Sequence, residues 1–194
     1  MTIAPTFSGW HALVLHVPDE GTDRLARQLR LLGMTAEVKW APLEGGGAQA
    51  DVVLVDADQG WDGLFPWPVG GAPMPLIALL QSEAPGRIAW AIAHGARALI
   101  AKPIAASAVY PALVLAASLH AERQITATRI AKLEERIRLR PLVHGAVRAL
   151  QDSRRIDEDA AYAVLRRAAM ARRLTLEQIA ADIVAGGVPL TEAG

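Results

Sequence analysis

Arginine is the dominant basic residue in the C-terminal part of the chain, where it suggests contact with a polyanion. Between residues 138 and 173 the sequence has nine Arg, no Lys and four acidic residues, a local excess of five positive charges. A guanidinium group binds a phosphate through two parallel hydrogen bonds and also stacks on unpaired bases. This segment is therefore predicted to bind nucleic acid, and an unpaired RNA loop is the target that suits arginine best.

Six of these arginines are the candidate contacts to RNA. Arg172 and Arg173 are expected in a turn, which would hold both side chains outward. Arg166 and Arg167 lie on an amphipathic segment, where each could equally belong to the solvated side of a helix. The six are Arg140, Arg148, Arg166, Arg167, Arg172 and Arg173. Tyr162 and Met170 lie among them, and we expect both in the hydrophobic core.

The net charge of the whole chain does not reveal this basic segment. The 194 residues include 20 Lys+Arg and 20 Asp+Glu, so the net charge is zero. Residues 1–120 carry 7 basic and 10 acidic residues (−3), whereas residues 121–194 carry 13 and 10 (+3). All five Trp lie in the first hundred residues. The uneven composition predicts two domains, and a 52% hydrophobic content excludes a disordered chain.

The residue types argue against an enzyme. Cys is absent, which excludes disulfides, thiolate metal sites and a Cys nucleophile. The five His show no i, i+4 metal-binding pair, and the glycines 45–47 precede an expected strand instead of opening a helix. We expect no catalytic site, no cofactor and no metal site. The sequence has neither a signal peptide nor an apolar run of about 18 residues, so a cytoplasmic location without membrane contact is expected.

Apolar runs and amphipathic segments alternate in the first 120 residues. Strands are expected at 12–17, 36–40, 51–56, 75–80 and 98–101, and helices at 22–32, 87–94 and 106–119. The crossover 60–71 is rich in Gly, Pro and Trp and does not favour a helix. Strands of this kind form a parallel sheet covered on both faces, and five of them predict an α/β flavodoxin-like domain.

The last part of the chain is expected to be helical. Residues 113–140 contain no Gly or Pro, and Leu119, Ile130, Leu133 and Ile137 have heptad spacing, although Arg123 falls on the same register. We expect a coiled coil that forms a homodimer, or else one long connecting helix. Pro141 either kinks this helix or opens a new one. Three short helices should follow, the last opened by a capping box at Thr175.

Two segments resemble the response-regulator receiver family. The segment 51–58 (DVVLVDAD), with WDG at 61–63, resembles the phosphorylation site, and 95–103 (GARALIAKP) resembles the fifth strand with its Lys-Pro. The resemblance places Asp56 at the phosphoacceptor position and Lys102 at the phosphate-pairing lysine.

Two groups that phosphorylation requires in this family are missing. The acidic pair that binds Mg²⁺ in the family is replaced by His16 and Val17. The Thr or Ser that the family has after its fourth strand would fall near Leu80, which cannot bond a phosphoryl oxygen. The expectation is therefore a pseudo-receiver that acts through protein contacts, with Asp56 as a polar strand-end residue and Lys102 as its partner.

Residues 140–184 resemble the ANTAR domain, an RNA-binding module of bacterial transcription antiterminators. The resemblance rests on 156–162 (IDEDAAY), 165–173 (LRRAAMARR) and 176–180 (LEQIA), and Arg140 falls on the Arg that opens the motif. One departure is the family's Ala-Lys-Gly, which here reads Ala146-Val147-Arg148. With a receiver-like part before it, the chain resembles the AmiR-type antiterminators. This predicts a pseudo-receiver at 1–118, a coiled-coil linker at 119–140 and an ANTAR domain at 141–194.

The resemblance implies a transcription antitermination regulator that binds hairpins in nascent leader RNA. By the same resemblance, a ligand-sensing repressor protein would silence it by binding. Two alternatives stay open: a phosphorylation-dependent response regulator, and a protein-interaction regulator that has lost RNA binding. A helix-turn-helix DNA reader is not expected, because too few residues follow position 187 for a recognition helix.

Overall fold

The chain folds into two compact units, residues 1–124 and 125–194. The computed structural model describes residues 5–43 and 50–186. The glycines at 45–47 and the segment 187–194, both considered above, lie outside the described residues. Within the described ranges, no helix is both long enough and apolar enough to cross a membrane.

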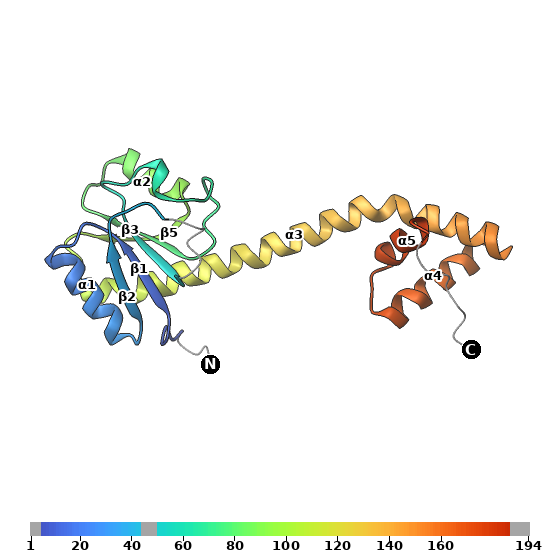
Figure 1. Ribbon diagram of the computed structural model, residues 1–194, viewed down its shortest axis with the longest axis horizontal. Coiled ribbons are helices and arrows are strands. Elements are labelled where there is room, and N and C mark those ends of the chain that lie inside the picture. The colour runs from blue at the N-terminus through green and yellow to red at the C-terminus, as the bar shows by residue number, and fades with distance from the viewer. Residues whose placement is uncertain (1–4, 44–49, 187–194) are drawn as a thin grey trace. The chain divides into compact units, whose positions relative to one another are not determined.

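Five parallel strands form the sheet of the N-terminal unit, in the order β2-β1-β3-β4-β5 (Figure 1). Every residue of the central strands β3 and β4 is buried, as expected for strands covered on both faces. The predicted flavodoxin-like order is confirmed. The strands are β1 (His11–Leu15), β2 (Thr35–Lys39), β3 (Val52–Asp56), β4 (Leu76–Leu80) and β5 (Ala96–Ala101).

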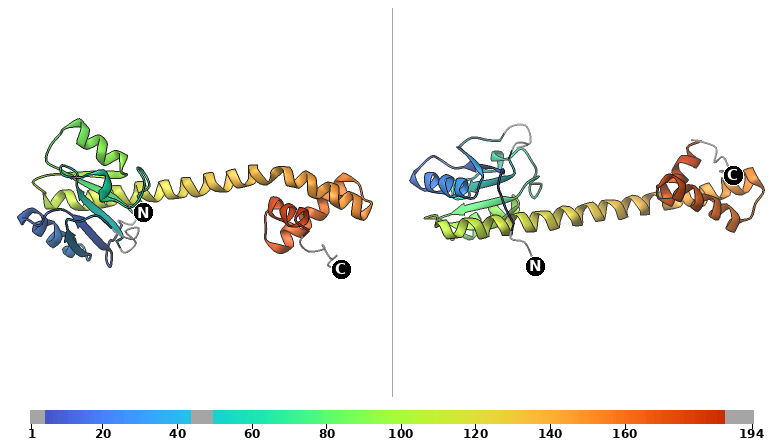
Figure 2. Two further views of the ribbon diagram at one scale, coloured as in Figure 1. Left: turned by 45° about the horizontal axis from the view of Figure 1, so that its top comes forward. Right: turned by 90° about the horizontal axis from the view of Figure 1, so that it is seen from below.

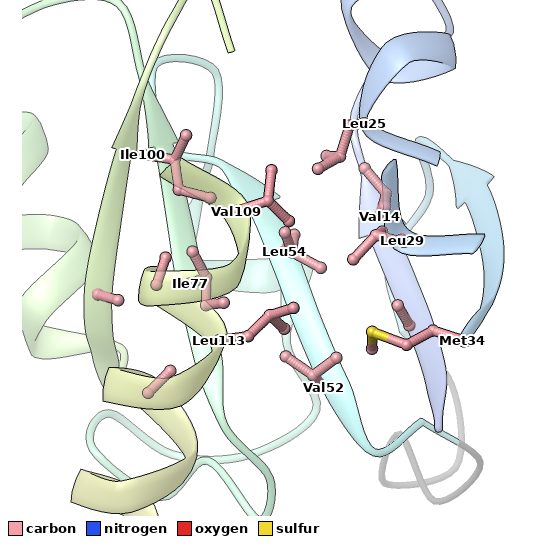
Figure 3. Packing of buried hydrophobic residues seen from close by; sticks show 14 of the residues in the cluster. Val14, Leu25, Leu29, Met34, Val52, Leu54, Ile77, Ile100, Val109 and Leu113 are labelled. Carbon is pink, nitrogen blue, oxygen red and sulfur yellow. The ribbon is translucent and has the colours of Figure 1, made fainter. Parts of the chain in front are cut away.

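Helices cover both faces of this sheet because successive strand residues point to opposite sides. On one face, α1 (Glu20–Leu31) and the first turns of α3 (Ala106–Arg154) pack over the strands; Figure 3 shows Leu25 and Leu113 on this face. On the other face lie α2 (Pro85–Ala93) and the short 3-10 helix η2 (Asp62–Leu64). η2 is the only helical segment in the crossover 60–71, as its composition indicated.

The C-terminal unit packs α4 (Glu158–Arg172) and α5 (Leu176–Val184) against the end of α3 (Figure 2). Asp157 caps α4 by accepting a hydrogen bond from Ala160 N at 2.8 Å. The capping box predicted at Thr175 is present. The core consists of small and aliphatic side chains: Ala146, Val147, Leu150, Ala161, Leu165, Ala169, Ile179 and Ala180.

α3 is longer than expected. It runs for 49 residues, through Pro141, as one α-helix. Pro141 therefore does not open a new helix, and the first of the three expected short helices is the last part of α3. A proline in a helix interior withholds one backbone hydrogen bond, but here the flanking turns stay helical because Ala146, Val147 and Leu150 pack in the core of the C-terminal unit.

Candidate functional site

The carboxyl ends of β3 and β5 bring Asp56 and Lys102 together. Asp56 is the last residue of β3 and only 1% exposed, and Lys102 directly follows β5. The Lys102 ammonium lies 2.8 Å from Asp56 Oδ1. Because parallel strands end at the same edge of a sheet, residues 46 positions apart in sequence meet here.

His16 joins this pair from the end of β1. Its Nδ1 lies 2.6 Å from the Val17 carbonyl oxygen, which can only accept, so we assign the proton to Nδ1. Its Nε2 lies 3.2 Å from Lys102 Nζ and 3.3 Å from Asp56 Oδ2. The only sign in the sequence that His16 faces Asp56 was that His16 stands where the receiver family has an acidic residue.

Asp58 completes the cluster. Its carboxylate lies 3.0 Å from Lys102 Nζ and accepts backbone hydrogen bonds from Gln81 at 2.7 Å and Ser82 at 3.1 Å. Burial alone would raise the pKa of Asp58, but the hydrogen bonds from Gln81, Lys102 and Ser82 outweigh it and lower that pKa. Burial likewise opposes the charge of Lys102, yet the two carboxylates raise its pKa. The lysine is therefore a fixed cation in this cluster.

The cluster does not fit the Mg²⁺ ion that the receiver resemblance implies. Mg²⁺ needs oxygen ligands in near-octahedral geometry, but the neighbours of Asp56 include the Lys102 ammonium, which has no lone pair to give, and the His16 imidazole, which offers only nitrogen. Within residues 5–43 and 50–186, no group of three or more His, Cys, Asp or Glu side chains is placed to hold a metal ion. We derive no chemistry through a metal at this edge of the sheet.

All six candidate arginines are exposed in the C-terminal unit. Arg140 and Arg148 lie on α3, and Arg166 and Arg167 lie on α4. Arg172 is the last residue of α4, not part of a turn, and Arg173 caps that helix in the left-handed conformation. The structure brings Arg140 and Arg166 to one groove, which neither Arg148 nor the other three arginines line.

This groove has a volume of about 800 Å³ and lies between the last part of α3 and the two following helices. Leu133, Ile137 and Arg140 line it from α3, and Tyr162 and Arg166 line it from α4. At the start of α5, Glu177 lies 3.5 Å from Arg136 Nε, and both line the groove. The groove thus combines apolar side chains, the phenol ring of Tyr162, the imidazole of His144, three guanidinium groups and the Glu177 carboxylate.

The expectation that Tyr162 and Met170 belong to the core is wrong. Tyr162 is 47% exposed and Met170 71% exposed. The core positions of α4 are Ala161, Leu165 and Ala169. A residue one position further along an α-helix is rotated by about 100°, so Tyr162 and Met170 point away from the core.

Two family models match the chain. The model described as "AmiR, N-terminal" matches residues 10–117, more than half of the chain, and the model "ANTAR domain" matches residues 131–184. The chain belongs to the AmiR family. Its AmiR N-terminal domain contains the sheet and the Asp56 cluster, and its ANTAR domain contains the groove and the candidate arginines.

Similarity to named proteins supports this assignment. The chain is 30% identical to the aliphatic amidase regulator of Pseudomonas aeruginosa over 175 residues, 89% of each chain. It is 33% identical to the transcriptional regulatory protein PdtaR of Mycobacterium tuberculosis over 106 residues, 55% of this chain and 52% of that protein. Both relatives are named as regulatory proteins. The response regulator StyR, 16% identical, has a similar fold with a TM-score of 0.50 over 90% of this chain and 98% of that one.

Proposed function

We propose that this AmiR-family protein is a transcription antitermination regulator whose ANTAR domain binds hairpins in nascent leader RNA. The observation that supports this most is that all six candidate arginines are exposed on that domain. Guanidinium groups bind phosphates and unpaired bases, and hairpins offer both. A bound hairpin would keep a terminator from forming, and such a regulator acts where transcripts are made, in the cytoplasm.

Control through protein contacts, without phosphorylation, is part of the proposal. Lys102 donates a hydrogen bond to Oδ1 of Asp56, and Nε2 of His16 lies 3.3 Å from Oδ2, which has no hydrogen-bond partner among the described residues. Because His16 stands where the family has an acidic residue, the cluster lacks the oxygen ligands for the Mg²⁺ that phosphorylation requires. A ligand-sensing repressor protein that binds this chain would then be the source of regulation.

A homodimer completes the proposal. Leu119, Ile130, Leu133 and Ile137, which we call the seam, are all exposed on α3. Exposed aliphatic residues at heptad spacing are buried when two helices pair. A second copy of α3 is the partner that this spacing fits.

The test is RNA binding by the full chain at several salt concentrations. If about four to six arginines neutralise phosphates, log K should fall by roughly three to five for each tenfold increase in salt. Arg172→Ala/Arg173→Ala should weaken binding and reduce that slope by about two. Arg24→Ala/Arg27→Ala, which removes two exposed arginines from α1, is the matched control and should change neither. Salt-insensitive binding that the first double substitution leaves unchanged would contradict the proposal.

One observation favours a second candidate, a protein-interaction regulator that has lost RNA binding. At the position where the ANTAR resemblance has Lys, this chain has Val147, which is buried in the domain core. Arg148, the next residue, is exposed and carries a positive charge one position after the place where the family has its Lys. Absence of binding to any structured leader RNA at low salt would support this second candidate.

A further inference from the structure

The groove of the C-terminal unit has walls of different chemistry. On the α3 side, Leu133 and Ile137 are apolar and exposed, and Arg140 lies three residues beyond Ile137. On the α4 side, Tyr162 and Arg166 are four residues apart and so share one face of the helix. A ligand in this groove would contact an aromatic ring and aliphatic side chains while two guanidinium groups lie beside it.

The charges of the groove favour an anionic ligand. Within residues 5–43 and 50–186, neither Arg140 nor Arg166 forms an ion pair with a carboxylate. Arg136 is different, because it pairs with Glu177. Two guanidinium groups without an acidic partner beside an apolar groove suit a ligand in which a flat ring with apolar faces is joined to phosphates.

We propose that this groove binds one unpaired nucleobase of RNA, stacked on Tyr162, while Arg140 and Arg166 bind the adjacent phosphates. This inference rests on the proposed function and names the part of the hairpin that enters the ANTAR domain. Stacking on an aromatic side chain is the usual way in which proteins hold a base from a loop. An apolar peptide would cover Leu133 and Ile137 but would leave the two arginines without a partner.

The experiment uses the full chain and two RNAs with the same stem. One is a hairpin with 2-aminopurine in its loop, and the other is a blunt duplex without unpaired bases. Tyr162→Leu removes the ring and keeps an apolar side chain, whereas Tyr162→Phe keeps the ring. Met170→Leu changes an exposed residue two turns further along α4 that does not line the groove, and it serves as the matched control.

The wild-type protein should bind the hairpin more tightly than the duplex and should quench the 2-aminopurine fluorescence. Tyr162→Leu should weaken hairpin binding by about tenfold, the expected effect of losing one stacked base. It should also abolish the quenching and leave duplex binding unchanged. Tyr162→Phe and Met170→Leu should behave like the wild type. Circular dichroism of the variants checks that they fold.

The possible failures are distinguishable. If the wild type binds the hairpin but a folded Tyr162→Leu variant gives the same affinity and quenching, the groove is not the base site and the proposed function stands. If the substitution instead shifts only the monomer–dimer equilibrium in sedimentation, the groove binds a second copy and the inference is overturned. If the wild type binds neither RNA, the proposed function fails and the inference fails with it.

Discussion

Lys102 is held between two carboxylates at the end of the sheet, and its pKa is raised by them against the effect of burial. The stability that comes from its charge is therefore present below its unfolded pKa of 10.5 and is lost as the pH rises through the folded value. For Asp58 the sign is opposite, because its pKa is lowered. Its contribution is present above the unfolded pKa of 3.8 and is lost as the pH falls through the folded value.

Lys102→Met should strongly destabilise the protein. The substitution leaves the buried carboxylate of Asp56 without its cation, and the loss of one partner of a buried pair costs about 3 kcal/mol or more. Urea unfolding of the wild type and the variant measures the loss.

Lys39→Met provides the control for this substitution. Lys39 also pairs with a carboxylate, that of Glu37 at 3.4 Å, but both side chains are substantially exposed. Exposed pairs contribute about 1 kcal/mol or less. Equal losses from the two substitutions would show that the Asp56 cluster is no more than a surface ion pair.

Asp56 should not accept a phosphoryl group. His16 and Lys102 lie beside its carboxylate, and the cluster does not fit Mg²⁺. Incubation with labelled acetyl phosphate and Mg²⁺ should leave the chain unlabelled. Labelling that Asp56→Asn abolishes would instead establish a phosphorylation-dependent response regulator.

At the scale of elements, α3 carries exposed aliphatic residues on more than one side. Ile130 belongs to the seam. Ile125 lies two residues after Arg123, which has the same heptad register as the seam, so Ile125 falls on the outer side of a paired helix, and it is exposed. Ile130→Glu should convert the proposed dimer to a monomer in analytical ultracentrifugation, because a carboxylate would be buried between the helices.

Ile125→Glu is the matched control and should leave the dimer intact. A wild-type protein that sediments as a monomer at all concentrations would contradict pairing through α3. Equal dissociation by both substitutions would place the contact on another side of the helix.

Across the whole molecule, the sequence predicted the parts that depend on local patterns. Each apolar run became a strand of the parallel sheet, and the caps at Asp157 and Thr175 lie where the residue types indicated. The Asp56–Lys102 contact also followed from the resemblance to receivers, and the structure brings these two side chains together.

The remaining features depend on contacts that local patterns do not specify. α3 continues through Pro141 because its following turns pack in the core of the C-terminal unit, which a local rule for proline does not include. The contact between His16 and Lys102 joins residues 86 positions apart. The exposure of Tyr162 depended on which of its neighbours form the core, and the small Ala161 and Ala169 form it in place of the larger side chains next to them.

Leu133 and Ile137 belong both to the seam and to the groove. A side chain buried against a second α3 cannot at the same time line a groove that is open to a base. The two proposed contacts are compatible only if helix pairing stops at Ile130. A dimer that binds RNA must therefore keep its two α3 helices apart from Leu133 onward, so that each copy presents its own open groove.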